Sequence, residues 1–368
     1  MDNVKTNAST NSNSKRSARP RRKRRSERLL AVLEPFEEVV VLMHDNPDPD
    51  AIASGWAIKR LIEEKLLKTV RLLGGGAIVR AENRYMVKLL QPPLELTDEL
   101  AIPPRTAIVL VDCGLQASNR LNVADGDCKI VAVIDHHESH EFTSKLPFRD
   151  LRPRVAASAT IAATYLREQN VSPNADLATA LMYALRSETR GNQTYYSSTD
   201  RGILPWLTRL ADPQKLAQIE DAPLSRAYYS DLVLALQNTF MYDAVAFCLL
   251  PRAEGAEIVG EVADLLIRCE EIHRVFCGAV VENDVVVSVR TDQEGGHATE
   301  LVQATLAGLG RGGGHVHRAG GKIAGRASGE RVSDELHEEL RRRWLETCSV
   351  DRQRGTRLVR RLEIAENL

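Results

Sequence analysis

The stretch Val-Val-Val-Leu-Met-His-Asp-Asn-Pro-Asp-Pro-Asp, residues 39–50, decides the fold of this chain. Its first five residues form an apolar run rich in Val, which is typical of a buried β-strand. The seven residues that follow contain one His and three Asp. Helix capping accounts for one of these carboxylates, because an Asp at a helix start accepts hydrogen bonds from free backbone amides. The histidine and the other two carboxylates indicate a chemical site at the end of the strand.

Short apolar runs alternate with helical segments beyond this point. The expected strands are Val39–Met43, Thr69–Leu73, Ala107–Val111 and Ile130–Ile134. The expected helices are Ile52–Leu67, Ala81–Leu90, Ala157–Glu168 and Ala175–Thr189. Near-continuous apolar strands that alternate with helices predict a parallel sheet covered on both faces. We therefore predict the α/β fold class for a first domain that extends to about Pro223.

A second, smaller domain is expected after a connecting helix, Leu224–Asn238. Its expected strands are Ala244–Leu250, Val275–Val281, Val285–Val289 and Gly320–Gly325. Its expected helices are Val259–Cys269, Ala298–Leu306 and Ser333–Thr347. This mixture predicts an α+β domain with a cleft between it and the first domain. The expected boundaries are a disordered basic tail at 1–28, the first domain at 29–223, a linker at 224–240, the second domain at 241–350 and a tail at 351–368.

The charge of the chain is nearly balanced overall but unevenly distributed. The net charge is −1, which argues against a basic coat protein for nucleic acid. The Arg-rich run between Lys15 and Arg28 has no apolar periodicity, so we expect it to be disordered. Blocks of like charge attract nucleic acid, which makes this tail a candidate contact. A tail that is merely solvated is the alternative.

The cysteines and the hydropathy bear on the compartment. None of the six cysteines forms a CxxC pair, and several lie in apolar runs; they are Cys113, Cys128, Cys248, Cys269, Cys277 and Cys348. We expect buried free thiols in a reducing compartment. No apolar stretch reaches the ~18 residues of a transmembrane helix, so no membrane contact is expected. These features favour a cytoplasmic protein.

Acidic and histidine residues also follow other expected strands. Asp112 ends one strand, Asp135-His136-His137 ends the next, and Glu188 lies late in a helix. Ligands bind at this edge of an open α/β sheet. A lone Asp or His there is more often structural, but two adjacent His preceded by Asp favour a metal site. Imidazole and carboxylate without thiolate suit manganese, iron or zinc, and oxygen-rich sites favour manganese.

Taken together, these motifs resemble the DHH phosphoesterases over about residues 36–325. The motifs are His44-x3-Asp48-x-Asp50, Asp112, Asp135-His136-His137 and Gly312-Gly313-Gly314-His315. The size and the glycine-rich segment resemble the subgroup of nanoRNases with pAp-phosphatase activity. The larger RecJ exonucleases share the core but have additional domains. The resemblance implies two divalent ions, with Mn²⁺ expected, and two such ions ~3.5–4 Å apart clamp a phosphoryl group and activate water.

The resemblance also assigns the metal ligands. His44, Asp48 and Asp112 resemble the ligands of the first ion. Asp50, Asp112 and His136 resemble the ligands of the second, so that Asp112 bridges the two.

Three further residues of this domain receive roles. His137 is expected to contact the substrate phosphate, and Asp135 to orient the site from behind the ligands. Glu188 departs from the family pattern, which has Thr-Asp-Thr where this chain has Ser-Glu-Thr. Its longer side chain moves the carboxylate, so we expect either a ligand of the second ion or a solvated helix residue.

The second domain contributes candidate substrate contacts. Ser288 and Arg290 resemble the family's Ser-x-Arg, in which the guanidinium grips a phosphate through two hydrogen bonds. Gly313, Gly314 and His315 lie in a glycine-rich loop whose backbone amides can approach phosphate closely. A surface Arg and a flexible loop are the alternatives. The earlier Gly74-Gly75-Gly76 lacks a phosphate-loop spacing, and we interpret it as a strand-to-helix turn.

These features predict the hydrolysis of phosphate esters in very short RNA or DNA oligonucleotides, or in pAp. A cyclic-dinucleotide phosphodiesterase, an inorganic pyrophosphatase and an exopolyphosphatase are alternatives on the same core. A nucleotide-binding regulator without catalysis follows if Glu188 does not hold the second ion. A homodimer is compatible with the sequence.

Overall fold

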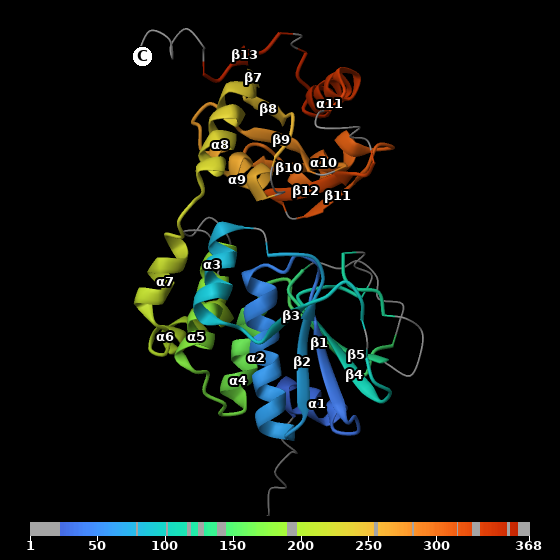
Figure 1. Cartoon of the computed structure of the whole chain (residues 1–368), viewed down its shortest axis with the longest axis vertical. Coiled ribbons are helices and arrows are strands. Elements are labelled where there is room, and N and C mark those ends of the chain that lie inside the picture. The colour runs from blue at the N-terminus through green and yellow to red at the C-terminus, as the bar shows by residue number, and fades with distance from the viewer. Residues whose placement is uncertain are drawn as a thin grey trace, which may run out of the picture. The chain divides into compact units, whose positions relative to one another are not determined.

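The chain folds into two compact units in the computed structural model (Figure 1). The first consists of Met1–Gly76 and Pro92–Asp212, and the second of Ala77–Gln91 and Pro213–Leu368. The residues that the structure describes are 23–78, 80–100, 102–115, 119–123, 129–137, 145–189, 197–253, 257–281, 283–314, 316–325, 332–351 and 354–359.

The first unit is built on a six-stranded parallel sheet with the strand order β3-β2-β1-β4-β5-β6. The strands are β1 (Glu38–Leu42), β2 (Thr69–Gly74), β3 (Leu94–Leu96), β4 (Thr106–Val111), β5 (Lys129–Asp135) and β6 (Phe148–Leu151). The predicted α/β class is confirmed, and the four expected strands are its four central ones. The two edge strands were not predicted, because one has three residues and the other, Phe-Arg-Asp-Leu, has two charged residues at its centre.

The two faces of this sheet are covered by different means. Helix α2 (Pro49–Leu66) packs on β1 and β2, and α4 (Ser158–Glu168) and α5 (Ala175–Thr189) pack on α2. The approach of α2 is close at Gly55, where a Cβ atom would lie 2.6 Å from Leu72 Cδ1. On the other face, the described apolar residues that cover the strands come from connecting segments; they include Leu100, Ile102, Leu115, Leu121, Val123 and Leu146.

A short helix, α1 (Arg25–Leu33), precedes the sheet and corrects the expected extent of the basic tail. The buried carboxylate of Asp150 on β6 binds the guanidinium of Arg25. The hydroxyl of Ser26 donates a hydrogen bond to Glu168 Oε2 at 2.5 Å. The described helix therefore begins within residues 1–28, and residues 1–22 lie outside the described part of the chain.

The second unit contains a seven-stranded sheet with the order β11-β12-β10-β9-β8-β7-β13. Its strands are β7 (Thr239–Tyr242), β8 (Val245–Leu250), β9 (Arg274–Val281), β10 (Asp284–Thr291), β11 (Arg311–Gly314), β12 (Arg318–Ile323) and β13 (Thr356–Arg357). Only β8 and β9 pair in parallel; the other pairs are antiparallel. The short strands β7, β11 and β13 were not predicted.

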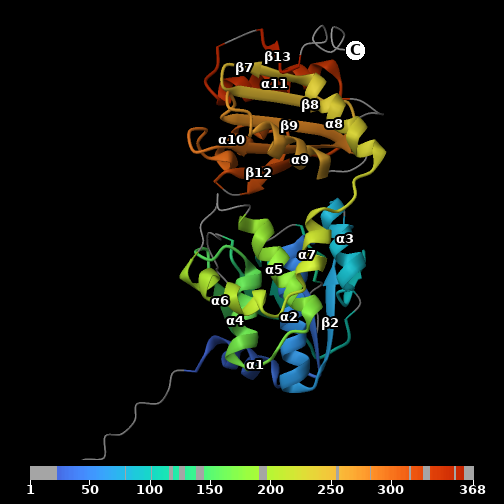
Figure 2. The same cartoon turned by 90° about the vertical axis from the view of Figure 1, so that its left-hand side faces the viewer.

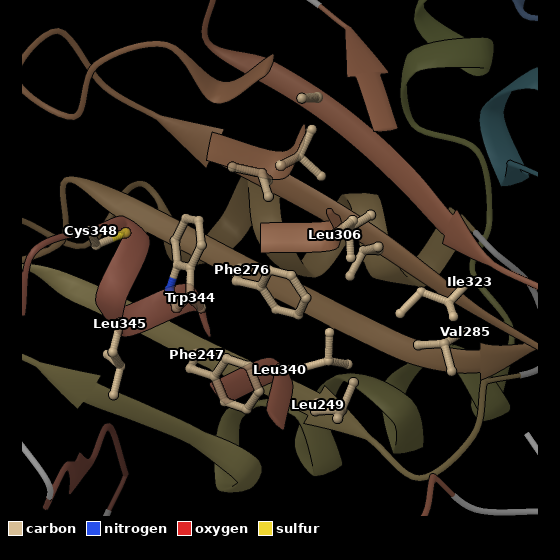
Figure 3. Close-up of a cluster of buried hydrophobic side chains, with 14 of the residues drawn as sticks. Phe247, Leu249, Phe276, Val285, Leu306, Ile323, Leu340, Trp344, Leu345 and Cys348 are labelled. Atoms are coloured by element: carbon tan, nitrogen blue, oxygen red, sulfur yellow. The ribbon is translucent and has the colours of Figure 1, made fainter. Parts of the chain in front are cut away.

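Helices lie on both faces of this second sheet (Figure 2). The helices α8 (Arg226–Asn238) and α9 (Glu257–Leu266) form one apolar cluster with β8 and β9. On the opposite face, α10 (Ala298–Leu306) and α11 (Asp334–Thr347) pack on the sheet. That core surrounds Trp344, whose Nε1 donates to the carbonyl of Ala246 at 3.1 Å, beside the stacked rings of Phe247 and Phe276 (Figure 3).

The units divide the chain at Asp212, whereas the sequence placed the boundary near Pro223. Helix α7 (Pro213–Glu220) accounts for the difference, because it contacts α3 (Ala81–Leu90), which belongs to the second unit. The expected linker at 224–240 corresponds to α8, which also belongs to the second unit. Helix α6 (Ser198–Thr208), in the first unit, was not predicted.

Two expectations about the whole chain can be compared with the described residues. The five described cysteines are free, and all but Cys269 are buried. Cys128 lies outside the described residues. None of the described helices has the length and apolar character needed to cross a membrane.

Candidate metal centre

The loop between β1 and α2 presents the first candidate ligands. Asp48 is the N-cap of α2: its Oδ1 accepts hydrogen bonds from the amides of Asp50 at 2.9 Å and Ala51 at 3.0 Å. Pro49 occupies the first helical position, where its missing N–H costs nothing. One of the three aspartates therefore caps the helix, and the others need a different explanation.

The imidazole of His44 is oriented by its own loop. Its Nδ1 lies 2.8 Å from the carbonyl of Asp45, so this nitrogen donates and Nε2 keeps a lone pair. Nε2 lies 3.9 Å from Asp48 Oδ1 and 3.8 Å from Asp112 Oδ2. Burial lowers the pKa of His44, but the charges of the two carboxylates outweigh it and raise the pKa above its usual value. A cation at this nitrogen would therefore be favoured.

Asp112 occupies the centre of the group. It follows β4 in the left-handed region, with φ of 55°, and only 2% of its surface is exposed. Asp tolerates this conformation better than most residues. Its Oδ2 faces His44, whereas its Oδ1 lies 3.7 Å from His136 Nε2 and accepts a hydrogen bond from Ser158 Oγ at 2.8 Å. The two oxygens of one carboxylate thus face different imidazoles.

Asp50 lies on the far side of Asp112 and is bound by the start of α4. Its oxygens accept from the backbone amides of Ser158 and Ala159, each at 2.7 Å. Helix α4 has no side-chain cap of its own, so Asp50 fills that role from α2. Its Oδ2 lies 3.6 Å from His136 Nε2. Burial raises the pKa of Asp50 well above its usual value, and the charges of Asp112 and other nearby carboxylates raise it further.

His136 and His137 differ in their protonation. Burial lowers the pKa of His136, which favours the neutral imidazole that metals bind. His137 Nδ1 donates to Asp135 Oδ1 at 2.7 Å. Burial lowers the pKa of His137, but this hydrogen bond and the charges of Asp112 and Asp135 outweigh it and raise the pKa to about 9. In the metal-free protein His137 therefore carries a positive charge near neutral pH.

The donors form two overlapping groups with metal-ligand chemistry. One is His44, Asp48 and Asp112; the other is Asp112, His136 and His137, and the ligand atoms of each lie within 4.8 Å of one another. The second group contains His137 where the sequence analysis expected Asp50. We keep Asp50 as the candidate ligand of the second ion. His137 Nδ1 already donates a hydrogen bond to Asp135, and Asp50 Oδ2 lies 3.6 Å from His136 Nε2.

The donor set fits divalent cations. Among the described residues, the ion pairs of Asp48, Asp50 and Asp112 are all with histidines. Asp50 and Asp112 are buried, and a buried carboxylate without compensating charge is costly. Each carboxylate has about four lone-pair sites, so the hydrogen bonds from α4 leave sites for a metal ion.

Glu188 lies in the last turn of α5 and is half-buried. It is not a member of either compact group. Its charge nevertheless contributes to the raised pKa of Asp50, which places its carboxylate within electrostatic range of the centre. Its role as a ligand stays a prediction.

The start of α4 is the part of the site that the sequence analysis missed. Ser158 and Ala159 hold two carboxylates of the centre, through one hydroxyl and two amides. The signal was weak: a run of small residues at the start of an expected helix, whose free amides are a ready anion site. The turn expected at Gly74–Gly76 has a local cause, because a Cβ atom on Gly75 would lie 2.1 Å from Asp45 Oδ1.

The candidate substrate residues of the second unit lie near one another. Ser288 on β10 and Gly313 on β11 both pair with Gly320 on β12. The three residues therefore lie on the same face of the sheet. Arg290 Nε donates to Asp264 Oδ1 on α9 at 2.8 Å. Gly314 has φ of 151°, and a Cβ atom at this position would collide with the backbone of β12. His315 lies outside the described residues.

Comparisons with known proteins agree with this fold. Residues 38–185 match the DHH family, N-terminal domain. This match confirms the resemblance drawn from the motifs for a DHH family domain over residues 38–185. An exopolyphosphatase-related protein from Bacteroides fragilis has a similar structure, with a TM-score of 0.66 at 16% identity over 88% of this chain and 95% of that one. At this identity the likeness concerns the fold.

Two relatives are similar in sequence over more residues than the DHH family match covers. An uncharacterized protein of Methanocaldococcus jannaschii is 29% identical over 286 residues, which cover 77% of this chain and 58% of that protein. The manganese-dependent inorganic pyrophosphatase of Methanothrix thermoacetophila is 24% identical over 184 residues, or 49% of this chain and 57% of that protein. The chain spans just over half the length of these relatives.

Replacing the central carboxylate should remove metal binding without harming the fold. We predict that Asp112→Asn lowers bound manganese from near two ions per chain to one or fewer, because one residue serves both ligand groups. In metal-free protein the melting temperature should stay equal or rise, since a buried like charge beside Asp50 is removed. Metal analysis after equilibrium dialysis, with exposed Asp98→Asn as the matched control, decides the matter. Two ions bound by the folded Asp112 variant would refute the assignment.

Glu188 can be tested by changing its length and its charge separately. We predict that Glu188→Ala weakens the second manganese site by about 10–100-fold, the usual cost of such changes around a metal. Glu188→Asp should keep or strengthen that site, because the family has Asp at this position. The measurement is a manganese titration by calorimetry. An unchanged titration for Glu188→Ala would make this residue an ordinary helix residue.

Proposed function

We propose that this protein is a manganese-dependent phosphoesterase that hydrolyses very short oligonucleotides, pAp, or both. The observation that carries the proposal is the position of Asp112, whose two oxygens face His44 and His136 separately. That arrangement suits a carboxylate shared by two metal ions. Bound there, two divalent ions would supply Lewis acids for the phosphoryl oxygens and an activated water. The manganese-dependent relative supports the choice of metal.

The residues around the centre have distinct tasks in this proposal. His44, Asp48 and Asp112 hold one ion, and Asp50, Asp112 and His136 hold the other, with Glu188 as a further ligand. Ser158 and the first amides of α4 hold the ligands in position.

His137 is the proposed contact to the substrate phosphate. Asp135 Oδ1 accepts a hydrogen bond from His137 Nδ1 at 2.7 Å. The Nε2–H of the imidazolium is therefore left to donate to an anion. The pKa of about 9 keeps this donor charged at neutral pH in the metal-free protein. Ser288, Arg290, Gly313, Gly314 and His315 are the proposed substrate contacts of the second unit.

An inorganic pyrophosphatase is the second candidate function, because relatives that match about half of this chain carry that name. A substrate panel separates the candidates. With manganese, the full chain should hydrolyse an RNA dinucleotide or pAp with a kcat/KM at least about tenfold above that for pyrophosphate, polyphosphate or a cyclic dinucleotide. Tenfold corresponds to ~1.4 kcal/mol of transition-state discrimination. A chelator should abolish the activity.

Other outcomes of this panel have definite meanings. Faster hydrolysis of pyrophosphate would replace the proposal by the second candidate. Two bound metal ions, tight nucleotide binding and no hydrolysis would leave a nucleotide-binding regulator. We also propose a cytoplasmic location, because the five described cysteines are free thiols. Homodimer formation stays a prediction.

The basic N-terminal segment is a proposed contact for longer nucleic acid. Deletion must stop at residue 22, because Arg25 and Ser26 bind Asp150 and Glu168 within the first unit. We predict that this deletion spares dinucleotide hydrolysis and weakens the binding of longer RNA. The slope of log K against log salt should flatten by ~0.7 for each phosphate that the segment neutralises. Identical slopes with and without the segment would exclude the contact.

A further inference from the structure

Within the described residues of the second unit, one face of its sheet is left partly open over β10, β12 and β11. The helices α8 and α9 form their apolar cluster with β8 and β9 on this side. On β10 the side chains of this face, such as Ser288 and Arg290, are half-buried, whereas Val285, Val287 and Val289 on the opposite face are at most 1% exposed. That opposite face is filled by the core around Leu306 and Trp344 (Figure 3). We call the open side the shelf.

The strand register arranges the shelf in three rows. Ser288, Gly320 and Gly313 pair across the strands and form a central row. Arg290 pairs with Arg318, two residues to one side, and we call this pair the arginine row. On the other side Lys322 pairs with Arg311, and we call this pair the lysine row. Two basic rows thus border an uncharged one.

The central row has room for a ligand. Among the described residues, a Cβ atom on Gly313 would meet nothing within 4 Å, and one on Gly320 would meet only the carbonyl of Val287 at 3.5 Å. On α9, Gly260 borders the row: a Cβ atom there would lie 3.6 Å from Ser288 Oγ and 3.5 Å from Arg290 Nη2. Larger side chains at these positions would occupy the space.

Each of the two basic rows forms ion pairs with a different carboxylate. Arg290 binds Asp264 on α9 at 2.8 Å, and the same carboxylate lies 4.0 Å from Arg318 Nε. Lys322 binds Asp284 at 2.5 Å, and Asp284 begins β10, at the end away from Arg290. Lys322 lies four positions after Arg318, which is ~13 Å along a strand. One phosphate cannot contact both rows at that spacing.

We propose that the lysine row is a second phosphate subsite, which selects oligonucleotides with more than one phosphodiester over mononucleotides and dinucleotides. This inference rests on the proposed function, in which Ser288 and Arg290 bind a phosphate. The lysine row binds a phosphate further along the same strand, and the nucleoside between them lies over the glycines. Inorganic polyphosphate fits less well, because every unit of that chain is charged and the central row offers no basic side chain.

Binding to the full chain tests this without depending on catalysis. Fluorescence anisotropy would compare labelled RNA of two and five nucleotides, in a chelator that prevents hydrolysis. The double variant Lys322→Ala/Arg311→Ala should bind the pentanucleotide roughly 2–30-fold more weakly, the range for two exposed ion pairs. Its slope of log K against log salt should fall by ~0.7 for each phosphate that these two side chains neutralise. Binding of the dinucleotide should be unchanged.

Matched variants separate charge, geometry and the underlying function. Lys322→Arg/Arg311→Lys should recover most of the pentanucleotide affinity. Arg342→Ala/Arg354→Ala removes the same charge from α11 and from the segment before β13, away from the shelf, and should leave both affinities unchanged. Arg290→Ala should weaken both RNAs, since it removes the phosphate contact on which the proposed function depends.

Each remaining outcome is decisive. Equal weakening of both RNAs by the lysine-row variant, or none, would overturn the second subsite. Polyphosphate that competes as well as RNA of equal charge would overturn the choice of ligand. If Arg290→Ala has no effect while the lysine row matters, the substrate contacts of the proposed function fail and the subsite survives.

Discussion

Two buried carboxylates, Asp50 and Asp112, are the constraint on which the first unit depends. They are 1% and 2% exposed, and their negative charges lie close enough to raise the pKa of Asp50. Such a pair is tolerable only with compensation, which comes from the first amides of α4, the hydroxyl of Ser158 and the flanking histidines. The starts of α2 and α4 and the ends of β1, β4 and β5 must therefore converge. The close packing at Gly55 and the left-handed backbone at Asp112 serve that convergence.

The central elements and the candidate metal ligands were accessible from the sequence because their signals are local. Apolar runs mark β1, β2, β4 and β5, and a buried parallel strand needs such a run on both faces. Since parallel strands end at one edge, the residues that follow them had to gather there. Histidine–carboxylate chemistry and the family resemblance then indicated their grouping, and the structure brings His44, Asp48, Asp50, Asp112, His136 and His137 together.

The contacts between distant segments were not accessible, because no local pattern encodes them. The bonds from α4 to Asp50 join residues more than a hundred positions apart. The partnership of Arg290 with Asp264 depends on how α9 lies on β10. The short strands β11 and β13 have too few apolar residues for a periodicity. The rows of the shelf likewise follow from strand register, which the sequence does not specify for a glycine-rich hairpin.

The central claim is that one carboxylate, Asp112, is shared by two metal ions at the edge of the parallel sheet. Crystals of the full chain grown with manganese would test it through anomalous scattering. The account predicts two anomalous peaks that both contact Asp112, one also beside His44 and Asp48, and the other beside Asp50 and His136. A single peak, or two peaks of which one does not contact Asp112, would contradict it.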